Sequence, residues 1–329
     1  MADFLRTEGL ETNFKTPKGI VHALNGVNIK VLEGEIVGLL GESGSGKSEL
    51  LSSIINQIIP LGSKIISGRV FFRGQDLTSM AKPELAKFQD KYFGIIKQDF
   101  ATSWDMGASV GKQISDRIIL NLGKNKDAAR SMAVEILGKV GFPDVNNRID
   151  DNPSNLSFGI LKLAAIANAI VCNPKLLILD EPFAGLDAIH QAQIIELMKQ
   201  MREDYGLTSL IASHDPGVIA SVAQWVIVLC SGYIVEEGSV MDLFLHPEHP
   251  YTLGLFGSLR RFNDNQRSKL DYINGFTPIF MEKPKFCPFV SRCKFSINRC
   301  KVENPTLEEV GIDHRLACWV DLKTGRARI

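Results

Sequence analysis

The residues best suited to chemistry form a glycine-rich loop early in the chain. Residues 41–48 match the pattern G-x-x-x-x-G-K-[ST], with an apolar stretch before them and a helical pattern after them. In such a loop, backbone N–H groups turn inward around phosphates, and the following helix adds its positive end. A chance glycine-rich turn is the alternative, but it fits poorly between a strand and a helix. We therefore expect Lys47 to reach the β- and γ-phosphates and Ser48 to bind Mg²⁺. This phosphate loop comprises Gly41, Glu42, Ser43, Gly44, Ser45, Gly46, Lys47 and Ser48.

Two carboxylates follow a second apolar stretch. Asp180 and Glu181 come directly after the four aliphatic residues 176–179. In a phosphate-loop fold, an aspartate at a strand end holds Mg²⁺, usually through water, and the next carboxylate can polarise the attacking water. The alternative is a strand capped by solvated acids, which is less common after four aliphatics. Together with the phosphate loop, this acidic strand end predicts nucleotide hydrolysis.

Alternating strands and helices must position these residues. Apolar strands are expected at about residues 36–40, 66–72, 92–97, 176–179, 209–212 and 226–229, with helices at about 46–57 and 188–201. Strand signals disappear in a helical insert at about residues 100–160. The pattern predicts an α/β domain with a mainly parallel core sheet.

Composition excludes several classes of protein. The chain has 329 residues, of which 22% are charged, and this is typical of an ordinary globular protein. No apolar run approaches the roughly 20 residues of a membrane span, and the N-terminus is not expected to be a secretory signal. Its 37 basic and 37 acidic side chains argue against a dedicated nucleic-acid binder. The neutral total combines two parts of opposite charge. Residues 260–329 carry 14 basic and 8 acidic side chains, and residues 1–259 carry the remaining 23 basic and 29 acidic ones.

Further motifs resemble those of a known family. Residues 180–187, Asp-Glu-Pro-Phe-Ala-Gly-Leu-Asp, resemble the Walker B motif and D-loop of ABC-transporter ATPases, with Asp187 as the D-loop aspartate. His214 matches the switch histidine of that family, and Gln98 matches its Q-loop glutamine. The resemblance implies that Glu181, His214 and Gln98 are catalytic, that Ser48, Gln98 and Asp180 bind Mg²⁺, and that Phe14 stacks on adenine. A plain core role for Phe14 stays equally open.

The C-terminal quarter resembles one branch of that family. Residues 249–253, His-Pro-Tyr-Thr-Leu, and the cysteine-containing segment after them are similar to oligopeptide, dipeptide and nickel importers. The resemblance implies a P-loop ABC ATPase with a mainly parallel core sheet, an antiparallel β subdomain and a helical subdomain. We expect a nucleotide-binding domain over residues 1–250 and a small cysteine-containing C-terminal extension over residues 251–329.

One segment departs from the family pattern. The signature reads Leu-Ser-Gly-Gly in the family, whereas Ser157, Phe158 and Gly159 stand here. The resemblance implies that this segment clamps the ATP of a partner subunit, where a phenylalanine side chain should obstruct the γ-phosphate. We therefore expect a heterodimer with one competent and one degenerate ATP site. A second departure is Phe100, where the family usually has proline after the Q-loop aspartate.

Four of the six cysteines lie in the C-terminal extension, with the spacing C-x5-C-x6-C-x17-C. Four reduced thiols point to a metal site rather than to disulfides. The resemblance implies a 4Fe–4S cluster, while Zn²⁺ and unligated structural cysteines remain alternatives. The predicted ligands are Cys287, Cys293, Cys300 and Cys318.

The resemblance also implies partners and a location. We expect an ATP- and Mg²⁺-dependent subunit at the cytoplasmic face of the membrane, energising import of peptides or related small solutes. Its partners are a second ABC ATPase, two integral-membrane permeases and, indirectly, an extracytoplasmic solute-binding protein, with no nucleic acid. The alternatives are a soluble ABC ATPase acting on nucleic acid or ribosomes, and a weakly hydrolysing regulatory subunit.

Overall fold

The structure is a computed structural model that describes residues 3–56, 63–257, 273–322 and 324–328. Its contacts divide the chain into two compact units. The first unit comprises Met1–Leu32, Val37–Ser79 and Ala212–Ile329, and the second comprises Glu33–Ile36 and Met80–Ile211. Gln57, the expected end of the first helix, and residues 258–272, 323 and 329 of the C-terminal extension lie outside the described residues.

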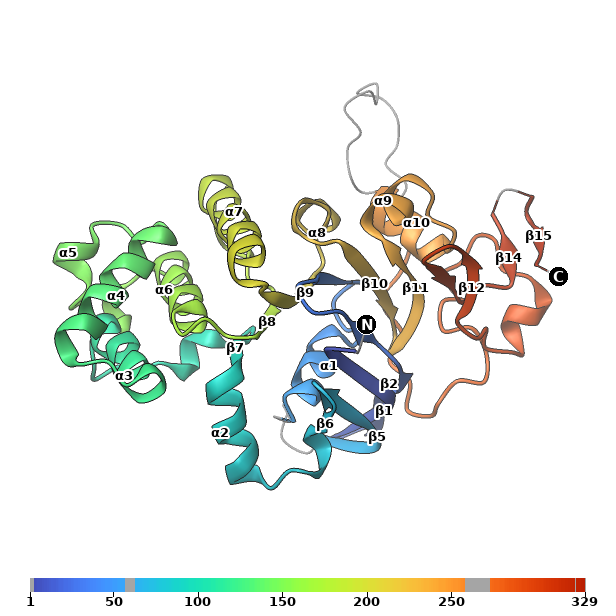
Figure 1. Ribbon diagram of the computed structural model, residues 1–329. Helices are drawn as coiled ribbons and strands as arrows, with labels where there is room; N and C mark the ends of the chain where they lie inside the picture. The colour runs from blue at the N-terminus through green and yellow to red at the C-terminus, as the bar shows by residue number, and fades with distance from the viewer. Residues whose placement is uncertain (1–2, 57–62, 258–272, 323, 329) are drawn as a thin grey trace. The chain divides into compact units, whose positions relative to one another are not determined.

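An antiparallel sheet forms one layer of the first unit (Figure 1). Its strands follow the order β2-β1-β5-β6, and β3 pairs with β1. The buried positions of β1 include Leu5, Thr7 and Leu10, so the apolar side chains face the core. The strands are β1 (Leu5–Thr16), β2 (Gly19–Val27), β3 (Lys30–Val31), β5 (Lys64–Phe72) and β6 (Gln75–Asp76).

The phosphate loop belongs to a second sheet of the first unit. Strand β4 (Ile36–Leu40) is buried at every position and pairs in parallel with β10 (Trp225–Cys230). A strand buried on both faces needs an unbroken apolar run, which explains why β4 shows no alternation. Strand β11 (Tyr233–Ser239) then returns antiparallel to β10. Helices α1 (Lys47–Ile54), α8 (Pro216–Val222), α9 (Val240–Leu245) and α10 (Pro250–Gly257) complete this part.

The C-terminal extension continues the same sheet. Strand β13 (His314–Leu316) pairs with β11, and β12 (Glu308–Gly311) pairs with β13. A separate two-stranded sheet joins β14 (Val320–Asp321) to β15 (Arg326–Ala327). The described part of the extension is therefore integrated into the first unit, while the domain boundary near residue 250 stays a prediction.

The second unit combines three strands with most of the long helices. Strand β8 (Leu176–Asp180) lies between β7 (Phe93–Ile96) and β9 (Thr208–Ser213), and β7 pairs with it in parallel. Figure 1 shows α3 to α6 gathered in one cluster. The helices are α2 (Lys82–Tyr92), α3 (Val110–Leu122), α4 (Lys126–Lys139), α5 (Val145–Arg148), α6 (Phe158–Ile170) and α7 (Ala188–Tyr205). Among the described residues, every helix is too short or too polar to cross a membrane.

Candidate nucleotide site

Close packing around Gly41 and Gly46 shapes the phosphate loop, which connects β4 to α1. A Cβ atom on Gly41 would lie 2.4 Å from the backbone oxygen of Leu229. Gly46, at φ 108°, precedes α1 in a left-handed conformation that favours glycine. Glycine is therefore required at both positions, which flank a tight turn that leads directly into α1, as in a phosphate-binding loop.

Two further contacts fix the backbone of the loop. The Lys47 ammonium donates hydrogen bonds to the carbonyl oxygens of Gly41 (2.6 Å) and Glu42 (2.9 Å). Gly232, in the turn between β10 and β11, donates its N–H to the Ser45 carbonyl at 2.8 Å. The lysine is thereby held beside the loop, where a bound phosphate would find both its charge and the backbone N–H groups.

The C-terminal extension also contacts the loop, at Glu42. Arg292 forms a two-pronged ion pair with the Glu42 carboxylate, with N–O distances of 2.7 and 2.8 Å. Thr277 donates a third hydrogen bond to the same carboxylate at 3.2 Å. The Glu42 N–H in turn donates to the hydroxyl oxygen of Tyr251 at 2.8 Å. Glu42 is thus held at both its side chain and its backbone.

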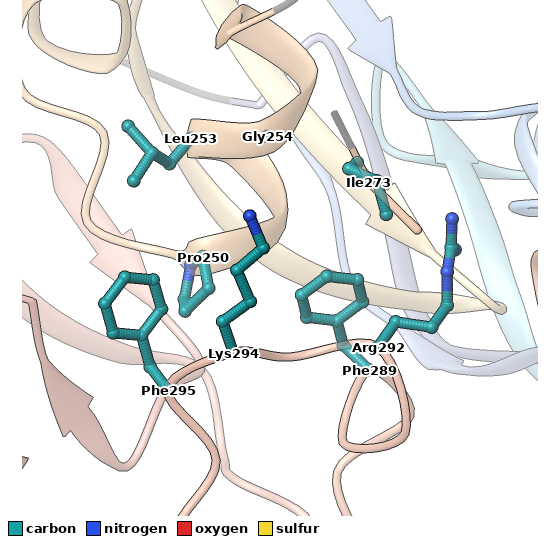
Figure 2. A pocket seen from close by; sticks show the side chains of 8 residues that line it. All are labelled: Pro250, Leu253, Gly254, Ile273, Phe289, Arg292, Lys294 and Phe295. Carbon is teal, nitrogen blue, oxygen red and sulfur yellow. The ribbon is translucent and has the colours of Figure 1, made fainter. Parts of the chain in front are cut away.

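Arg292 also borders a pocket in the C-terminal extension (Figure 2). The pocket has a volume of about 100 Å³ and is mainly apolar. Its wall includes Phe289, whose ring lies 5.7 Å from the Arg292 guanidinium and meets Tyr251 edge-on at 5.2 Å. The lining residues are Pro250, Leu253, Gly254, Ile273, Phe289, Arg292, Lys294 and Phe295.

The acidic strand end belongs to the second unit. Asp180 is the buried last residue of β8, and Glu181 follows it with a φ of 49°. The buried Lys162 of α6 donates hydrogen bonds to the backbone oxygens of Glu181 (3.0 Å) and Ala184 (2.6 Å). Burial lowers the pKa of Lys162, although the nearby charges of Glu181 and Asp180 oppose this shift. Lys162 therefore fixes the backbone that presents Glu181.

The signature segment begins α6 in the same unit. Ser157 caps this helix by accepting a hydrogen bond from the Ile160 N–H at 3.4 Å. The side chain of Phe158 is half exposed and packs on the ring of Phe100, with centroids 5.0 Å apart. The Lys162 ammonium lies 5.3 Å from both ring centroids. The two departures from the family pattern therefore contact each other and share one cation.

The remaining predicted residues lie at element ends. Gln98 follows β7 and is exposed, and His214 follows β9 and is also exposed. Asp187 caps α7 through a 2.9 Å hydrogen bond from the His190 N–H, and this bond lowers the pKa of Asp187. Phe14 is a half-buried residue of β1.

The predicted residues divide between the two units. The phosphate loop, Phe14 and His214 belong to the first, whereas Gln98, the acidic strand end, the signature segment and Asp187 belong to the second. Oxygen donors are the ligands that Mg²⁺ prefers, and Ser48, Gln98 and Asp180 all supply them. The chemistry of this set therefore fits the predicted ion.

The four cysteines of the C-terminal extension are free thiols. Burial, with smaller contributions from the other three cysteines, raises the pKa of Cys287 to about 12. Burial likewise raises the pKa of Cys318 to about 11, with contributions from Cys293 and Cys300. Across the described ranges, however, there is no group of three or more His, Cys, Asp or Glu residues arranged to hold a metal ion. The described residues therefore do not show the predicted metal site.

The sequence predicts no individual role for Tyr251, Arg292 or Lys162. Tyr251 belongs to residues 249–253 and Arg292 to the cysteine-containing segment after them, and no local signal pairs either with Glu42. Lys162 carried a detectable signal, because it is the only charged residue in the apolar helix α6. A charge inside an apolar helix needs buried partners, so the helix pattern could have indicated it.

Known proteins resemble the chain along almost its whole length. Residues 24–184 match the family model of the ABC transporter, and residues 235–300 match that of the oligopeptide/dipeptide transporter C-terminal region. The oligopeptide transport ATP-binding protein AppD of Bacillus subtilis is 38% identical over 307 residues, covering 93% of each chain. The probable peptide ABC transporter ATP-binding protein y4tR of Sinorhizobium fredii is 36% identical over 315 residues, covering 96% of this chain and 94% of that protein.

Solved structures agree with these relatives. The structure of cbiO1 from Clostridium perfringens has a TM-score of 0.61 and 30% identity, covering 75% of this chain and 92% of that one. The dimeric bacterial ABC transporter cassette MJ0796 has a TM-score of 0.66 and 25% identity, covering 72% of this chain and 98% of that one. The predicted ABC ATPase fold is confirmed. The chain belongs to the ABC transporter family and is an ATP-hydrolysing subunit that carries the C-terminal region of the oligopeptide/dipeptide transporters.

Proposed function

We propose that the chain hydrolyses ATP at the cytoplasmic face of the membrane to drive import of peptides or related small solutes. The observation that carries this proposal is the phosphate loop, with the Lys47 ammonium held on the carbonyl oxygens of Gly41 and Glu42. The names of the relatives, which include peptide and oligopeptide ATP-binding proteins, support the class of solute. The two family-model matches, over residues 24–184 and 235–300, support transport rather than action on nucleic acid or ribosomes.

The predicted residues would divide the work of hydrolysis. The phosphate loop binds the triphosphate, and Lys47 offsets its negative charge. Glu181 accepts a proton from the attacking water, while His214 and Gln98 keep that water aligned. When bound at Ser48, Gln98 and Asp180, Mg²⁺ neutralises charge on the β- and γ-phosphates. Such hydrolysis needs positioning and charge stabilisation more than covalent chemistry, which suits this set.

The proposed complex contains two permeases, a second ABC ATPase and, indirectly, a solute-binding protein. The half-exposed Phe158 supports a heterodimer, because it stands where the family has a glycine that lets the backbone approach a partner's γ-phosphate. In such a pair this chain's own ATP meets the partner's signature, and the partner's ATP meets Phe158. A homodimer would contain two impaired sites.

Purification from membranes tests the proposed assembly. We expect the permeases and a distinct second ATPase to co-purify with the chain, and ATP hydrolysis by the complex to exceed that of the chain alone. Equal hydrolysis by the isolated chain would contradict the heterodimer. A complex whose transport is unaffected by Glu181→Gln would favour the weakly hydrolysing regulatory subunit instead.

A separate proposal concerns the four thiols. We propose that Cys287, Cys293, Cys300 and Cys318 bind an iron–sulfur cluster, with Zn²⁺ as the alternative. The support is that the four thiols lie close enough together to influence one another electrostatically. The described residues contain no group of three or more ligands arranged to hold a metal ion. Anaerobic purification followed by an absorbance spectrum and iron and zinc assays tests it. A colourless protein without either metal would leave the cysteines as structural thiols.

A further inference from the structure

Glu42 places a negative charge in the loop that is proposed to bind the phosphates of ATP. Its carboxylate belongs to the proposed phosphate-binding loop, so an uncompensated charge there would repel the nucleotide. The Arg292 guanidinium offsets that charge through two short, parallel hydrogen bonds. Paired ionic hydrogen bonds of this kind are roughly twice as strong as neutral ones and fix orientation as well as charge.

The contacts around Glu42 form one connected network. Arg292 is itself fixed by the backbone oxygen of Asn274, to which its Nε donates at 2.8 Å. Its guanidinium faces the ring of Phe289, which packs edge-on against Tyr251. Tyr251 is fully buried and accepts the Glu42 N–H. The side chain and the backbone of Glu42 are therefore held by two residues that share a common support.

The second contact decides which N–H groups of the loop are available. Because the Glu42 N–H donates to the Tyr251 hydroxyl, it is already paired and is not available to a phosphate. The exposed residues Ser43 and Gly44 follow it, and the first turn of α1 supplies further N–H groups. Holding Glu42 in this way orders the loop before the nucleotide arrives, which reduces the entropy lost on binding.

We propose that Arg292 and Tyr251 are positioning residues for ATP, through which the C-terminal extension sets the charge and the conformation of the phosphate loop. This inference rests on the proposed function, because it assumes that the loop binds ATP. It assigns the extension a direct role at the nucleotide site, in addition to its structural role in the sheet.

Titration of the purified full-length chain with ATP and Mg²⁺ by calorimetry tests the proposal. We expect Arg292→Ala to weaken ATP binding about tenfold, since it leaves the Glu42 charge exposed to the phosphates. Arg292→Lys should give an intermediate affinity, because lysine keeps the charge but loses the two-pronged geometry. Tyr251→Phe should weaken binding by about threefold, through loss of the acceptor for the Glu42 N–H.

A double variant separates this role from a merely structural one. In the background of Glu42→Gln, replacing Arg292 by alanine should change ATP affinity by less than about twofold, because the charge to be offset is gone. Lys283→Ala is the matched control: it removes a cation of the same extension that pairs with Glu11 rather than with Glu42. We expect this control to bind ATP like the unmodified chain.

The possible failures are distinguishable. If the unmodified chain does not bind ATP, the proposed function is wrong. If it binds ATP but Arg292→Ala binds equally well, or if the loss persists undiminished beside Glu42→Gln, the positioning role is wrong. Should Arg292→Ala fail to fold, Arg292→Lys decides, because an affinity equal to that of the unmodified chain then overturns the proposal.

Discussion

The phosphate loop and the signature segment are held by cations in two different ways. At the loop, Arg292 pairs with a carboxylate that retains some exposure, and its own partner residue lies 250 positions away in the sequence. At the start of α6, the buried Lys162 lies beside two aromatic rings and donates to backbone oxygens only 19 and 22 positions away. The first region is therefore sensitive to charge, and the second is sensitive to burial and packing.

The largest expected effect separates binding from hydrolysis. Glu181→Gln should lower the ATPase rate of the assembled complex about a thousandfold, since a positioned general base contributes on that order. ATP affinity should stay unchanged, because Glu181 acts on the attacking water, whereas the phosphate loop binds the triphosphate. Steady-state ATPase assays together with ATP titration measure both quantities. A variant that hydrolyses ATP normally would remove Glu181 from the mechanism.

Acid should destabilise the first unit through His249. Burial lowers the pKa of His249 to about 4, whereas the unfolded chain titrates at 6.5. Between these values the unfolded state binds more protons, so stability falls as the pH falls, by about 3 kcal/mol at pH 4. Glu236 and His314 face the same cluster, and hydrogen bonding to Glu236 raises the pKa of His314. His314 therefore adds stability below pH 6.5 that is lost as the pH rises, and this partly offsets the effect of His249.

Chemical denaturation between pH 4 and 7 measures this effect. His249→Gln should reduce the slope of stability against pH, because glutamine does not titrate. His190, the histidine of the second unit, is partly exposed, and His190→Gln serves as the control. An unchanged slope in His249→Gln would contradict the proposed cause.

Removing the buried ammonium should destabilise the second unit. Lys162→Met keeps the length of the side chain but leaves the backbone oxygens of Glu181 and Ala184 without this donor, at a cost of about 2 kcal/mol. Urea denaturation measures the change. Lys139→Met is the control, because Lys139 forms an exposed ion pair within α4, and such surface pairs contribute little to stability. If both substitutions lower the free energy of unfolding equally, the hydrogen bonds of the buried Lys162 ammonium do not stabilise the second unit as proposed.

The smallest expected effect tests the altered signature. Phe158→Gly should raise the ATPase rate of the assembled heterodimer about twofold, because it restores the second of two sites. Phe158→Leu keeps an obstructing side chain and should leave the rate unchanged. If both variants hydrolyse ATP at the original rate, Phe158 does not impair the partner's site.

The main strands and the helix around the phosphate loop follow from local sequence patterns. The apolar runs at residues 36–40 and 176–179 are parts of β4 and β8, and the helix after the phosphate loop begins at Lys47. These elements can be predicted from the sequence, because a buried parallel strand needs a continuous apolar run and a phosphate loop needs glycines at fixed spacing. By contrast, no pattern near Glu42 indicates that Arg292 is its partner.

The sequence by itself determined the family, the ATPase class and the identity of the phosphate loop and the acidic strand end, because each motif is contiguous and its chemistry depends on spacing along the chain. Only the tertiary structure decided what holds them: Arg292 and Tyr251 at the loop, and Lys162 beneath Phe158. The physical reason is that an ion pair or a buried hydrogen bond depends on distance in space, and the chain brings these groups together only after strands and helices have packed.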